Sequence, residues 1–438
     1  MLAPKNTEFV TWLREVAPYI HKHRNKTLVV GFDGDLVRSG ALDNLVQDIA
    51  LLQAMGLRIV LVHGLRPQIE EQLVLRNVQS TFVNDIRVTD SIALECAKEA
   101  AGELRLDIEA SFSQGLPNTP MAGARISVVS GNFVTAKPIG IVQGTDYQHT
   151  GIVRKVDSDS IKQLLASNKI VLLSPLGFSP TGQAFNLSME DVAAQTAIAI
   201  KADKLIFISE FSGLYDENRD LISELSLETA TELINSGILN KDESEYIKHM
   251  LRSLRLGVER CHIIPFNVDG AVLLELFLHD GIGTMITNQD LEYLREATLD
   301  DVGAIVQLIE PLEQDGTLVP RGRNIIERDI HSFSVIEHDG VIFGCAVMYT
   351  YPEVKMAEMA CLTVLSEAQS MGDGERLLKH IEKKAKRQGI ENLFVLTTRT
   401  EHWFLKRGFK HAKPEDLPPS RLKQYNWNRR SMVLIKKL

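Results

Sequence analysis

The sequence predicts two consecutive domains, a three-layer α/β domain with a mainly parallel sheet and a smaller α+β domain. The chain has 438 residues, enough for two or three domains. Strand-like and helix-like runs alternate through about residue 285, and the order changes after "TMITNQDLEYLREATLDD". We therefore place the first domain at 1–286, a linker at 287–292 and the second domain at 293–438.

The first domain begins with a helix, "TEFVTWLREVAPYIHKH", whose Phe9, Leu13, Val16 and Ile20 form one apolar stripe. Apolar runs predict strands at 27–32, 58–64, 170–177, 204–213 and 261–266. Helices are predicted between them near 42–55, 66–77, 89–104, 189–202 and 243–257. Such alternation favours a parallel sheet covered on both faces, with ligands at the carboxyl ends of its strands.

The second domain is predicted to start with a helix over about 300–312, followed by strands within 332–340, 341–351 and 356–364. A glycine-bearing loop then leads into a helix that ends near Gly389. On that helix Leu377, Leu378, Ile381 and Ala385 share one face, whereas Lys379, Lys383, Lys384 and Arg387 are expected to face water. A strand at 392–398, a short helix within 401–409 and a closing strand at 431–437 complete the domain.

Composition narrows the function classes. Four cysteines (Cys96, Cys261, Cys345 and Cys361) occur without a CxxC pair, which favours a reducing cytoplasm and predicts no zinc site. No signal-like start or apolar run of about 18 residues appears, so membrane insertion and export are not expected. The net charge is −9, made up of −10 over residues 1–290 and +1 over residues 291–438. Neither part has the basic excess of a nucleic-acid binder, and the second suits an anionic ligand.

The loop before the second-domain helix is a candidate anion site. Gly372 and Gly374 allow backbone N–H groups to converge at the positive end of the helix. A diphosphate could bind there without a metal. The alternative is a glycine-bearing helix start that binds no ligand.

Three motifs in order resemble the GNAT family of acetyltransferases over roughly the last 145 residues. Residues 369–374, "QSMGDG", match the Q/R-x-x-G-x-G/A loop that holds the coenzyme A pyrophosphate; "ACLTV" precedes it and "WFLKRGF" follows it. The resemblance implies acetyl-CoA as co-substrate. It assigns as coenzyme contacts Cys361, Leu362, Val364, Gln369, Ser370, Met371, Gly372, Asp373, Gly374 and Phe404.

Acetyl transfer to an amine requires that a base remove a proton from it. Glu358, on the strand before the loop, resembles the general base of the family; the alternative is a solvated strand glutamate. Thr397 could bond the substrate or protonate the departing thiolate. The usual tyrosine donor is replaced by Trp403 and Phe404, so the acid stays unassigned. Cys361 as an acetylated nucleophile is the less favoured route, because a cysteine on a buried strand is usually inert.

Two arginines at the two ends of the second domain are candidate substrate contacts. Arg321 in "LVPRGR" and Arg429 in "WNRRSMV" could each hold a carboxylate through paired hydrogen bonds, with Ser431 beside them. Two such groups would suit a dicarboxylic amino acid. The alternative is a pair of surface arginines without a ligand.

The first domain resembles the amino-acid kinase family, and most closely its acetylglutamate kinases. The matching pieces are "IVLVHG", "NDIRVTD", "FNLSMEDVAAQTA", "ADKLIFISEFSGLYDENRDLI" and "LLELFLHDGIGTMI". Two departures argue against phosphoryl transfer, which depends on positioned positive charge. Gly31 stands where the family has a lysine, and the kinase "HGGG" loop is here His63-Gly64-Leu65-Arg66.

Arginine sensing is the property that the first domain is expected to have kept. The resemblance assigns Tyr19, Lys204, His262, Glu275 and Gly281 as effector contacts. Glu275 could pair with a guanidinium or an amino group, and Gly281 leaves a carbonyl accessible. The alternative role of the first helix is to pack on the core and join subunits, and both roles can hold together.

Together the two domains resemble one family, the bacterial-type N-acetylglutamate synthases. The resemblance implies direct acetyl transfer from acetyl-CoA to L-glutamate in a ternary complex, as the first step of arginine biosynthesis, with feedback inhibition by L-arginine. It also implies a cytoplasmic homo-oligomer, a hexamer by analogy, with no metal. Two alternatives stay open: an acetyltransferase for another amino acid or amine, and an arginine-binding regulatory protein with a vestigial transferase domain.

Overall fold

The chain folds as two compact units, residues 1–289 (unit 1) and 290–438 (unit 2), and the division falls inside the range 287–292. The computed structural model describes residues 4–115, 119–216, 219–278, 281–288, 292–338, 340–365 and 373–438. Among these residues, no helix has the length and apolar character needed to cross a membrane.

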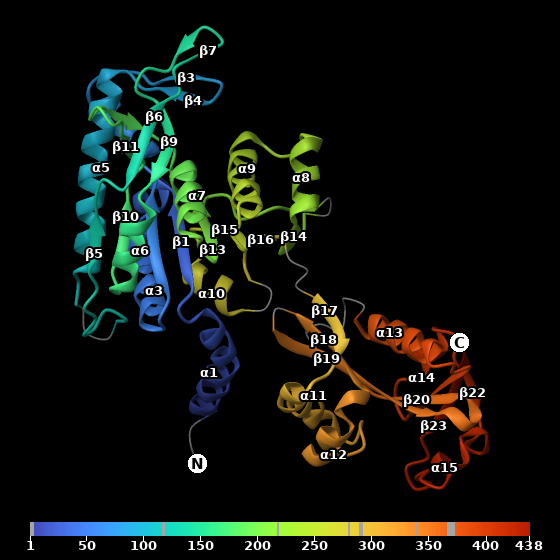
Figure 1. The fold of residues 1–438 in the computed structure, drawn as a ribbon. Helices are drawn as coiled ribbons and strands as arrows, with labels where there is room; N and C mark the ends of the chain where they lie inside the picture. The colour runs from blue at the N-terminus through green and yellow to red at the C-terminus, as the bar shows by residue number, and fades with distance from the viewer. Residues whose placement is uncertain are drawn as a thin grey trace. The chain divides into compact units, whose positions relative to one another are not determined.

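Unit 1 is centred on a sheet of order β14-β16-β15-β13-β1-β2-β10-β5 (Figure 1). All neighbouring pairs are parallel except β15 and β16. Its strands are β1 (Thr27–Phe32), β2 (Arg58–His63), β5 (Val128–Ser130), β10 (Ile170–Leu173), β13 (Lys204–Ser209), β14 (Glu224–Ser226), β15 (Arg260–Pro265) and β16 (Thr284–Thr287). The mainly parallel sheet predicted for this domain is confirmed.

Both faces of this sheet are buried, because alternate strand residues enter different cores. On β1, Leu28, Val30 and Phe32 pack in one core with α3 and α5, whereas Val29 packs in the other with α7 and α9. The helices of unit 1 are α1 (Pro4–His23), α2 (Gly34–Arg38), α3 (Leu42–Ala54), α4 (Arg66–Leu75), α5 (Ser91–Phe112), α6 (Ser158–Ala166), α7 (Met189–Ile200), α8 (Leu227–Ser236), α9 (Lys241–Arg255) and α10 (Ala271–Phe277). The predicted three layers are therefore present.

The predicted strand over 170–177 is wrong as a single element. Its first part is β10, and its second part is β11 (Leu176–Phe178), which belongs to another sheet of order β12-β11-β6-β9. Pro175 separates the two, and a proline cannot donate the N–H that a central strand requires. The remaining strands of unit 1 are β12 (Ala184–Asn186), β6 (Val134–Pro138), β9 (Gly151–Val156), and the hairpins β3 (Thr81–Val83)–β4 (Ile86–Val88) and β7 (Ile141–Val142)–β8 (Thr145–Asp146).

Unit 2 is built on a sheet of order β17-β18-β19-β20-β21-β23-β22. Its strands are β17 (Glu292–Glu296), β18 (Phe333–His338), β19 (Val341–Tyr351), β20 (Met356–Val364), β21 (Asn392–Thr397), β22 (Lys410–Ala412) and β23 (Met432–Lys437). Its helices are α11 (Val302–Gln314), α12 (Gly322–Asp329), α13 (Asp373–Arg387), α14 (Glu401–Leu405) and α15 (Pro419–Leu422). The predicted α+β order is confirmed. Four elements were not predicted, because each is only three to eight residues long: β17, β22, α12 and α15.

The amphipathic pattern of α13 correctly predicts its packing. Leu377, Leu378, Ile381 and Ala385 are all buried against the sheet. One prediction on its polar face is wrong: Lys384 does not simply face water but is half-buried in an ion pair with Glu296 of β17. The unpredicted strand β17 supplies that carboxylate.

Candidate active site and effector cluster

The candidate active site lies where strands β20 and β21 separate. Their parallel pairing covers only Met356 to Glu358 on β20, opposite Asn392 to Phe394 on β21. Beyond Glu358, β20 continues to Val364 without a described ladder partner on that edge. Buried backbone N–H and C=O groups require partners, so this edge of β20 can bond an extended ligand.

Glu358 stands at the point of separation and is held by an arginine. Its side chain is buried (4% exposed) and accepts two hydrogen bonds from Arg421, at 2.6 Å to Oε2 and 3.0 Å to Oε1. Burial raises the pKa of Tyr351 to about 12, and the nearby carboxylate of Glu358 adds to the effect. Glu358 is therefore not a solvated strand glutamate, and the forked Arg421 contact fixes its orientation.

A β-bulge follows Glu358 on the same strand. Cys361 has φ +55°, and the register between β19 and β20 shifts between Cys345 and Val347. Leu362 and Val364 beyond it are half-buried, and Val364 pairs with Gly344. The bulge re-aims the backbone of Cys361 and Leu362, the groups expected to face the thioester. The Cys361 thiol is buried (4% exposed) beside Cys345, whose Sγ lies 3.7 Å from the Cys361 carbonyl oxygen.

The predicted coenzyme loop is only partly described. Gln369, Ser370, Met371 and Gly372 lie outside the described residues. Asp373 begins α13, and its buried carboxylate pairs with Arg376 at 3.2 Å. The first amides of a helix have no intrahelical partner, so this end of α13 can receive an anion.

Gly374 has a steric reason to be glycine. A Cβ at this position would lie 3.3 Å from the Trp403 indole. Arg407 lies over that indole, 3.9 Å from the ring centroid, and also binds the Trp403 carbonyl and Glu375. Phe404 is buried (5% exposed) in the core of unit 2, with edge-to-face contacts to neighbouring aromatic rings. Trp403, rather than Phe404, therefore lies beside Gly374 at the start of α13.

The structure brings Arg321 and Arg429 to one segment, residues 317–321. Arg429 donates to the Thr317 carbonyl at 2.6 Å, and Arg321 donates to the Val319 carbonyl at 3.3 Å. Ser431 follows Arg429 by two residues, and its carbonyl accepts a hydrogen bond from Tyr425 at 2.7 Å. Two guanidinium groups at one loop can bind two carboxylates, although each is at present bonded to a backbone carbonyl.

Tyr349 connects this segment to Glu358. It lies directly opposite Glu358 on the neighbouring strand β19. Burial raises the pKa of Tyr349, and Arg321 opposes that rise, which places Arg321 beside the tyrosine. Side chains opposite each other in an antiparallel pair share a face of the sheet, so the arginine segment and Glu358 border the same site.

Thr397 lies at the end of β21 with its hydroxyl in a local turn. Its Oγ1 is 2.9 Å from the Thr400 Oγ1 and accepts the Thr400 N–H at 3.1 Å. These bonds give it a structural task. The hydroxyl would have to exchange a bond to contact substrate.

In unit 1, three of the five predicted effector residues form a hydrogen-bonded chain, and Gly281 lies against its end. Lys204 Nζ lies 3.4 Å from His262 Nε2, and His262 Nδ1 lies 2.6 Å from Glu275 Oε1. The second oxygen of Glu275 accepts the N–H groups of Ile282 and Gly283 at 2.8 and 3.0 Å. Gly281 has φ +60°, and a Cβ there would lie 2.5 Å from Glu275 Oε2, so only glycine fits.

The charge states of Lys204, His262 and Glu275 determine which atom donates in each of these hydrogen bonds. Burial lowers the pKa of His262, and Lys204 lowers it further, so the ring is neutral at pH 7. Burial raises the pKa of Glu275, but the hydrogen bonds from His262 and the two amides outweigh it and the pKa is lowered. His262 thus donates from Nδ1 to the carboxylate and accepts at Nε2 from the Lys204 ammonium.

The first helix lies beside this cluster. On α1, Tyr19 is half-buried and packs on the core, and His23 Nε2 bonds the Leu276 carbonyl of α10 at 2.9 Å. The predicted stripe is not continuously buried. Val16 is buried but Leu13 is 45% exposed, and the side chain of Phe9 lies outside the described residues.

At Gly31, where the kinases have a lysine, the side chains of Met189 and Phe207 occupy the space that a lysine would need. A Cβ on Gly31 would lie 2.6 Å from Met189 Sδ and 3.0 Å from the Phe207 ring. Nearby, Tyr246 donates a hydrogen bond to Asp33 at 2.5 Å, and burial raises the pKa of Asp33 to about 7. A half-buried acid therefore follows the carboxyl end of β1, where a kinase requires positive charge.

Three functional neighbours escaped sequence reasoning: Arg421, Trp403 and Met189. Arg421 follows Glu358 by 63 residues and belongs to a four-residue helix, so no local pattern signals the contact. Trp403 could have been suspected, because it stands next to the residue assigned from the family pattern.

Comparisons with known proteins cover the whole chain. A model of the amino acid kinase family matches residues 26–265, and a model of the acetyltransferase (GNAT) family matches residues 281–409. An amino-acid acetyltransferase of Ralstonia nicotianae is 68% identical over 435 residues, covering 99% of this chain and 96% of the relative. One of Pseudomonas fluorescens is 46% identical, covering 98% and 100%.

Two solved structures of N-acetylglutamate synthase from Neisseria gonorrhoeae are also similar, each 38% identical and covering 98% of this chain and 99% of the other. The one complexed with coenzyme A and L-arginine gives a TM-score of 0.85. The one complexed with coenzyme A and N-acetyl-glutamate gives a TM-score of 0.62.

Proposed function

Since this chain belongs to the bacterial-type N-acetylglutamate synthase family of amino-acid acetyltransferases, we propose that its amine substrate is L-glutamate and that L-arginine inhibits it. It is an acetyltransferase that uses acetyl-CoA. In the reaction, the glutamate nitrogen forms a bond to the acetyl carbon, the bond from that carbon to the coenzyme sulfur breaks, and the amine loses a proton. The observation that carries the proposal is Glu358, buried and oriented where β20 separates from β21.

Glu358 is the proposed general base in a direct transfer. Arg421 keeps its carboxylate in one orientation through two hydrogen bonds, so little reorientation is needed when the amine arrives. The burial of Glu358 favours proton removal through one water molecule. The bulge at Cys361 supports a role for the Cys361 and Leu362 amides in polarising the thioester carbonyl. Cys361 as a nucleophile is disfavoured, since its side chain is only 4% exposed.

Arg321 and Arg429 are the proposed contacts for the two glutamate carboxylates, with Ser431 beside them. Their shared position on segment 317–321 supports this role, because two carboxylates of one molecule require two cations at one place. Glutamate would replace the backbone carbonyls that these guanidinium groups now bond. Thr397 is the proposed hydroxyl near the thiolate, and it would give up its bond to Thr400 to act.

The coenzyme pyrophosphate is proposed to bind at the start of α13, through the amides of Gln369 to Gly374. Gly374 supports this position, because a glycine leaves room for the Trp403 indole beside the first turn of α13. Two positive side chains, Arg376 and Arg407, lie in or beside the first turns of the helix. No metal is required for this mode of binding.

The proposed arginine site is the cluster of Lys204, His262, Glu275 and Gly281, with Tyr19 from the first helix. Glu275 supplies the buried carboxylate that a guanidinium or an amino group prefers, and the 281–283 loop supplies carbonyls. Phosphoryl transfer by unit 1 is not expected, since Met189 fills the space of the missing lysine. Exposed Val10 and Leu13 on α1 favour subunit contacts through that helix in a cytoplasmic homo-oligomer.

The test is release of coenzyme A from acetyl-CoA with L-glutamate, L-aspartate, L-glutamine or L-lysine, each with and without millimolar L-arginine. Glutamate-selective turnover that arginine suppresses supports both proposals. If arginine does not change the turnover with glutamate, the proposed substrate stands and the proposed effector site is refuted. Selective turnover with another amine, or none at all, refutes the substrate assignment.

Alanine variants test whether Arg321 and Arg429 bind glutamate specifically or only add positive charge near the site. Arg321→Ala and Arg429→Ala are expected to raise KM for glutamate by about 10- to 100-fold, because a charge-assisted bond contributes about 1.5–3 kcal/mol. Their exposed neighbours Arg323→Ala and Arg430→Ala are the matched controls. Equal effects in variants and controls contradict the assignment.

A further inference from the structure

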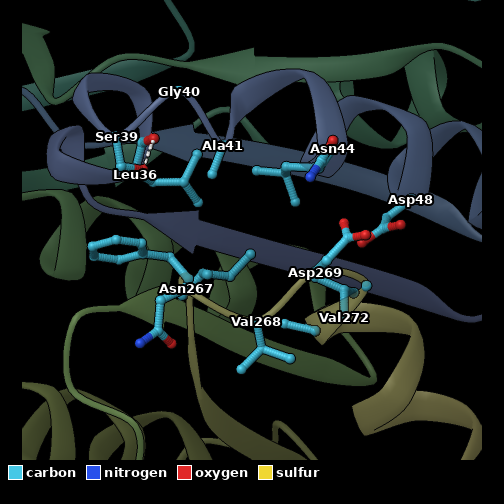
Figure 2. A pocket seen from close by; sticks show the side chains of 15 residues that line it. Leu36, Ser39, Gly40, Ala41, Asn44, Asp48, Asn267, Val268, Asp269 and Val272 are labelled. Carbon is cyan, nitrogen blue, oxygen red and sulfur yellow. Dashed lines mark hydrogen bonds between the residues drawn. The ribbon is translucent and has the colours of Figure 1, made fainter.

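A cavity in unit 1 shares no lining residue with the effector cluster or with the former kinase site. It has a volume of about 390 Å³ and lies between α2, the first half of α3 and the loop 266–270 that joins β15 to α10. Small-molecule sites have volumes of about 300–1,000 Å³, so the cavity can enclose a compact ligand. Figure 2 shows the side chains that line it.

Two carboxylates face each other in this cavity. Asp48, from α3, is 9% exposed and has no hydrogen-bond or ion-pair partner among the described residues. Figure 2 shows its carboxylate and that of Asp269 pointing toward one another. Burial raises the pKa of Asp48 to about 7, and the charge of Asp269 adds to the effect. Buried carboxylates are normally paired, so an unpaired one aimed into a cavity indicates a missing cation.

The rest of the lining indicates which cation. Apolar side chains of Leu36, Leu45 and Val272 form part of the wall, and Asn44 and Asn267 also line the cavity. Ca²⁺ takes six to eight oxygen ligands and Mg²⁺ an octahedral set of them, whereas much of this wall is hydrocarbon. In the described part of the chain, no group of three metal-ligating His, Cys, Asp or Glu side chains occurs.

We propose that this cavity binds a small organic cation, an amine or guanidinium with a short hydrocarbon part. The cationic end lies between Asp48 and Asp269, and the hydrocarbon lies against Leu36, Leu45 and Val272. The site shares no residue with the Lys204, His262 and Glu275 cluster, so its occupant is a second ligand of unit 1.

The test is calorimetric titration of the full chain with putrescine, together with hydrogen exchange followed by mass spectrometry. Putrescine is expected to bind saturably and to protect segments 36–48 and 266–272. Uncharged 1,4-butanediol, which has a similar length, is expected to do neither. MgCl2 at the same concentration is expected to leave these segments unprotected.

Two variants locate the binding. Asp48→Asn and Asp269→Asn keep the shape of the side chain and are each expected to weaken putrescine binding by about 10-fold or more. Asp107→Asn, an exposed change on α5, is the control and is expected to bind like the parent. Asp269 is itself exposed, so its variant remains informative if Asp48→Asn fails to fold.

Four outcomes of the experiments with the parent chain would overturn the proposal. These are no saturable binding, protection confined to segment 275–283 of the effector cluster, equal binding by the diol, and protection of the two cavity segments by MgCl2. Undiminished binding by both asparagine variants would also overturn it, because the two carboxylates are the whole basis of the charge argument.

Discussion

Replacing Asp33 with asparagine is expected to stabilise unit 1 at alkaline pH. Asp33 follows β1, is half-buried, and accepts a hydrogen bond from Tyr246 at 2.5 Å. Burial raises its pKa from 3.8 to about 7, and the charges of Glu190 and Asp35 add to the effect. The asparagine carbonyl can still accept the Tyr246 hydroxyl, so the substitution removes the ionisation and keeps the contact.

The sign and size follow from linkage between protonation and folding. Because the folded-state pKa is raised, the contribution of Asp33 to stability is fully present below pH 3.8 and is lost as pH rises toward 7. The shift from 3.8 to about 7 corresponds to about 4 kcal/mol lost above pH 7, at 1.36 kcal/mol per pH unit. Asparagine does not titrate, so its advantage over aspartate should grow by about 3 kcal/mol between pH 5 and pH 8.

The assay is urea unfolding at pH 5 and pH 8, with hydrogen exchange in β1 and β13 as the signal specific to unit 1. Asp107→Asn, exposed on α5, provides the control for loss of one negative charge. A constant difference between Asp33→Asn and the parent at the two pH values would refute the reasoning. A variant less stable than the parent at pH 8 would show that Asp33 has an ionic partner in solution.

Three further predictions concern catalysis, regulation and coenzyme binding. Glu358→Gln should lower kcat by about 10²- to 10⁴-fold, the usual contribution of a general base, while Glu353→Gln on the exposed turn before β20 leaves kcat unchanged. Glu275→Gln should abolish the arginine response and lower the free energy of unfolding of unit 1 by about 2 kcal/mol at pH 7.5, measured by urea unfolding. Because the pKa of Glu275 is lowered in the folded state, its stabilisation is present above pH 4.5 and is lost as pH falls. A variant as sensitive to acid as the parent would contradict this. Gly374→Val should raise KM for acetyl-CoA by about 10-fold or more, because its Cβ and methyl groups meet the Trp403 indole, and an unchanged KM would exclude coenzyme binding at this helix start.

The arrangement of the elements could be predicted well because it depends on local periodicity. The alternation of apolar residues on β1 determines which face each side chain occupies, and the stripe on α13 determines its buried side. The glycine at position 31, where the family pattern has a lysine, argued against kinase chemistry from the sequence alone. Periodicity did not predict that the strand ends before Pro175. Proline lacks the backbone N–H that a central strand requires, and this outweighs the apolar run.

The contacts that determine chemistry were decided by the tertiary structure. The sequence placed Glu358 on a strand, but the forked contact with Arg421 joins residues 63 positions apart. The sequence marked His262 and Glu275 separately, and only folding brings them to 2.6 Å and thereby sets their protonation states. Asp48 and Asp269 carried no signal, since a carboxylate becomes informative only when burial leaves it without a partner. Residue type and period determine what each element is, whereas pKa and orientation depend on neighbours that distant segments supply.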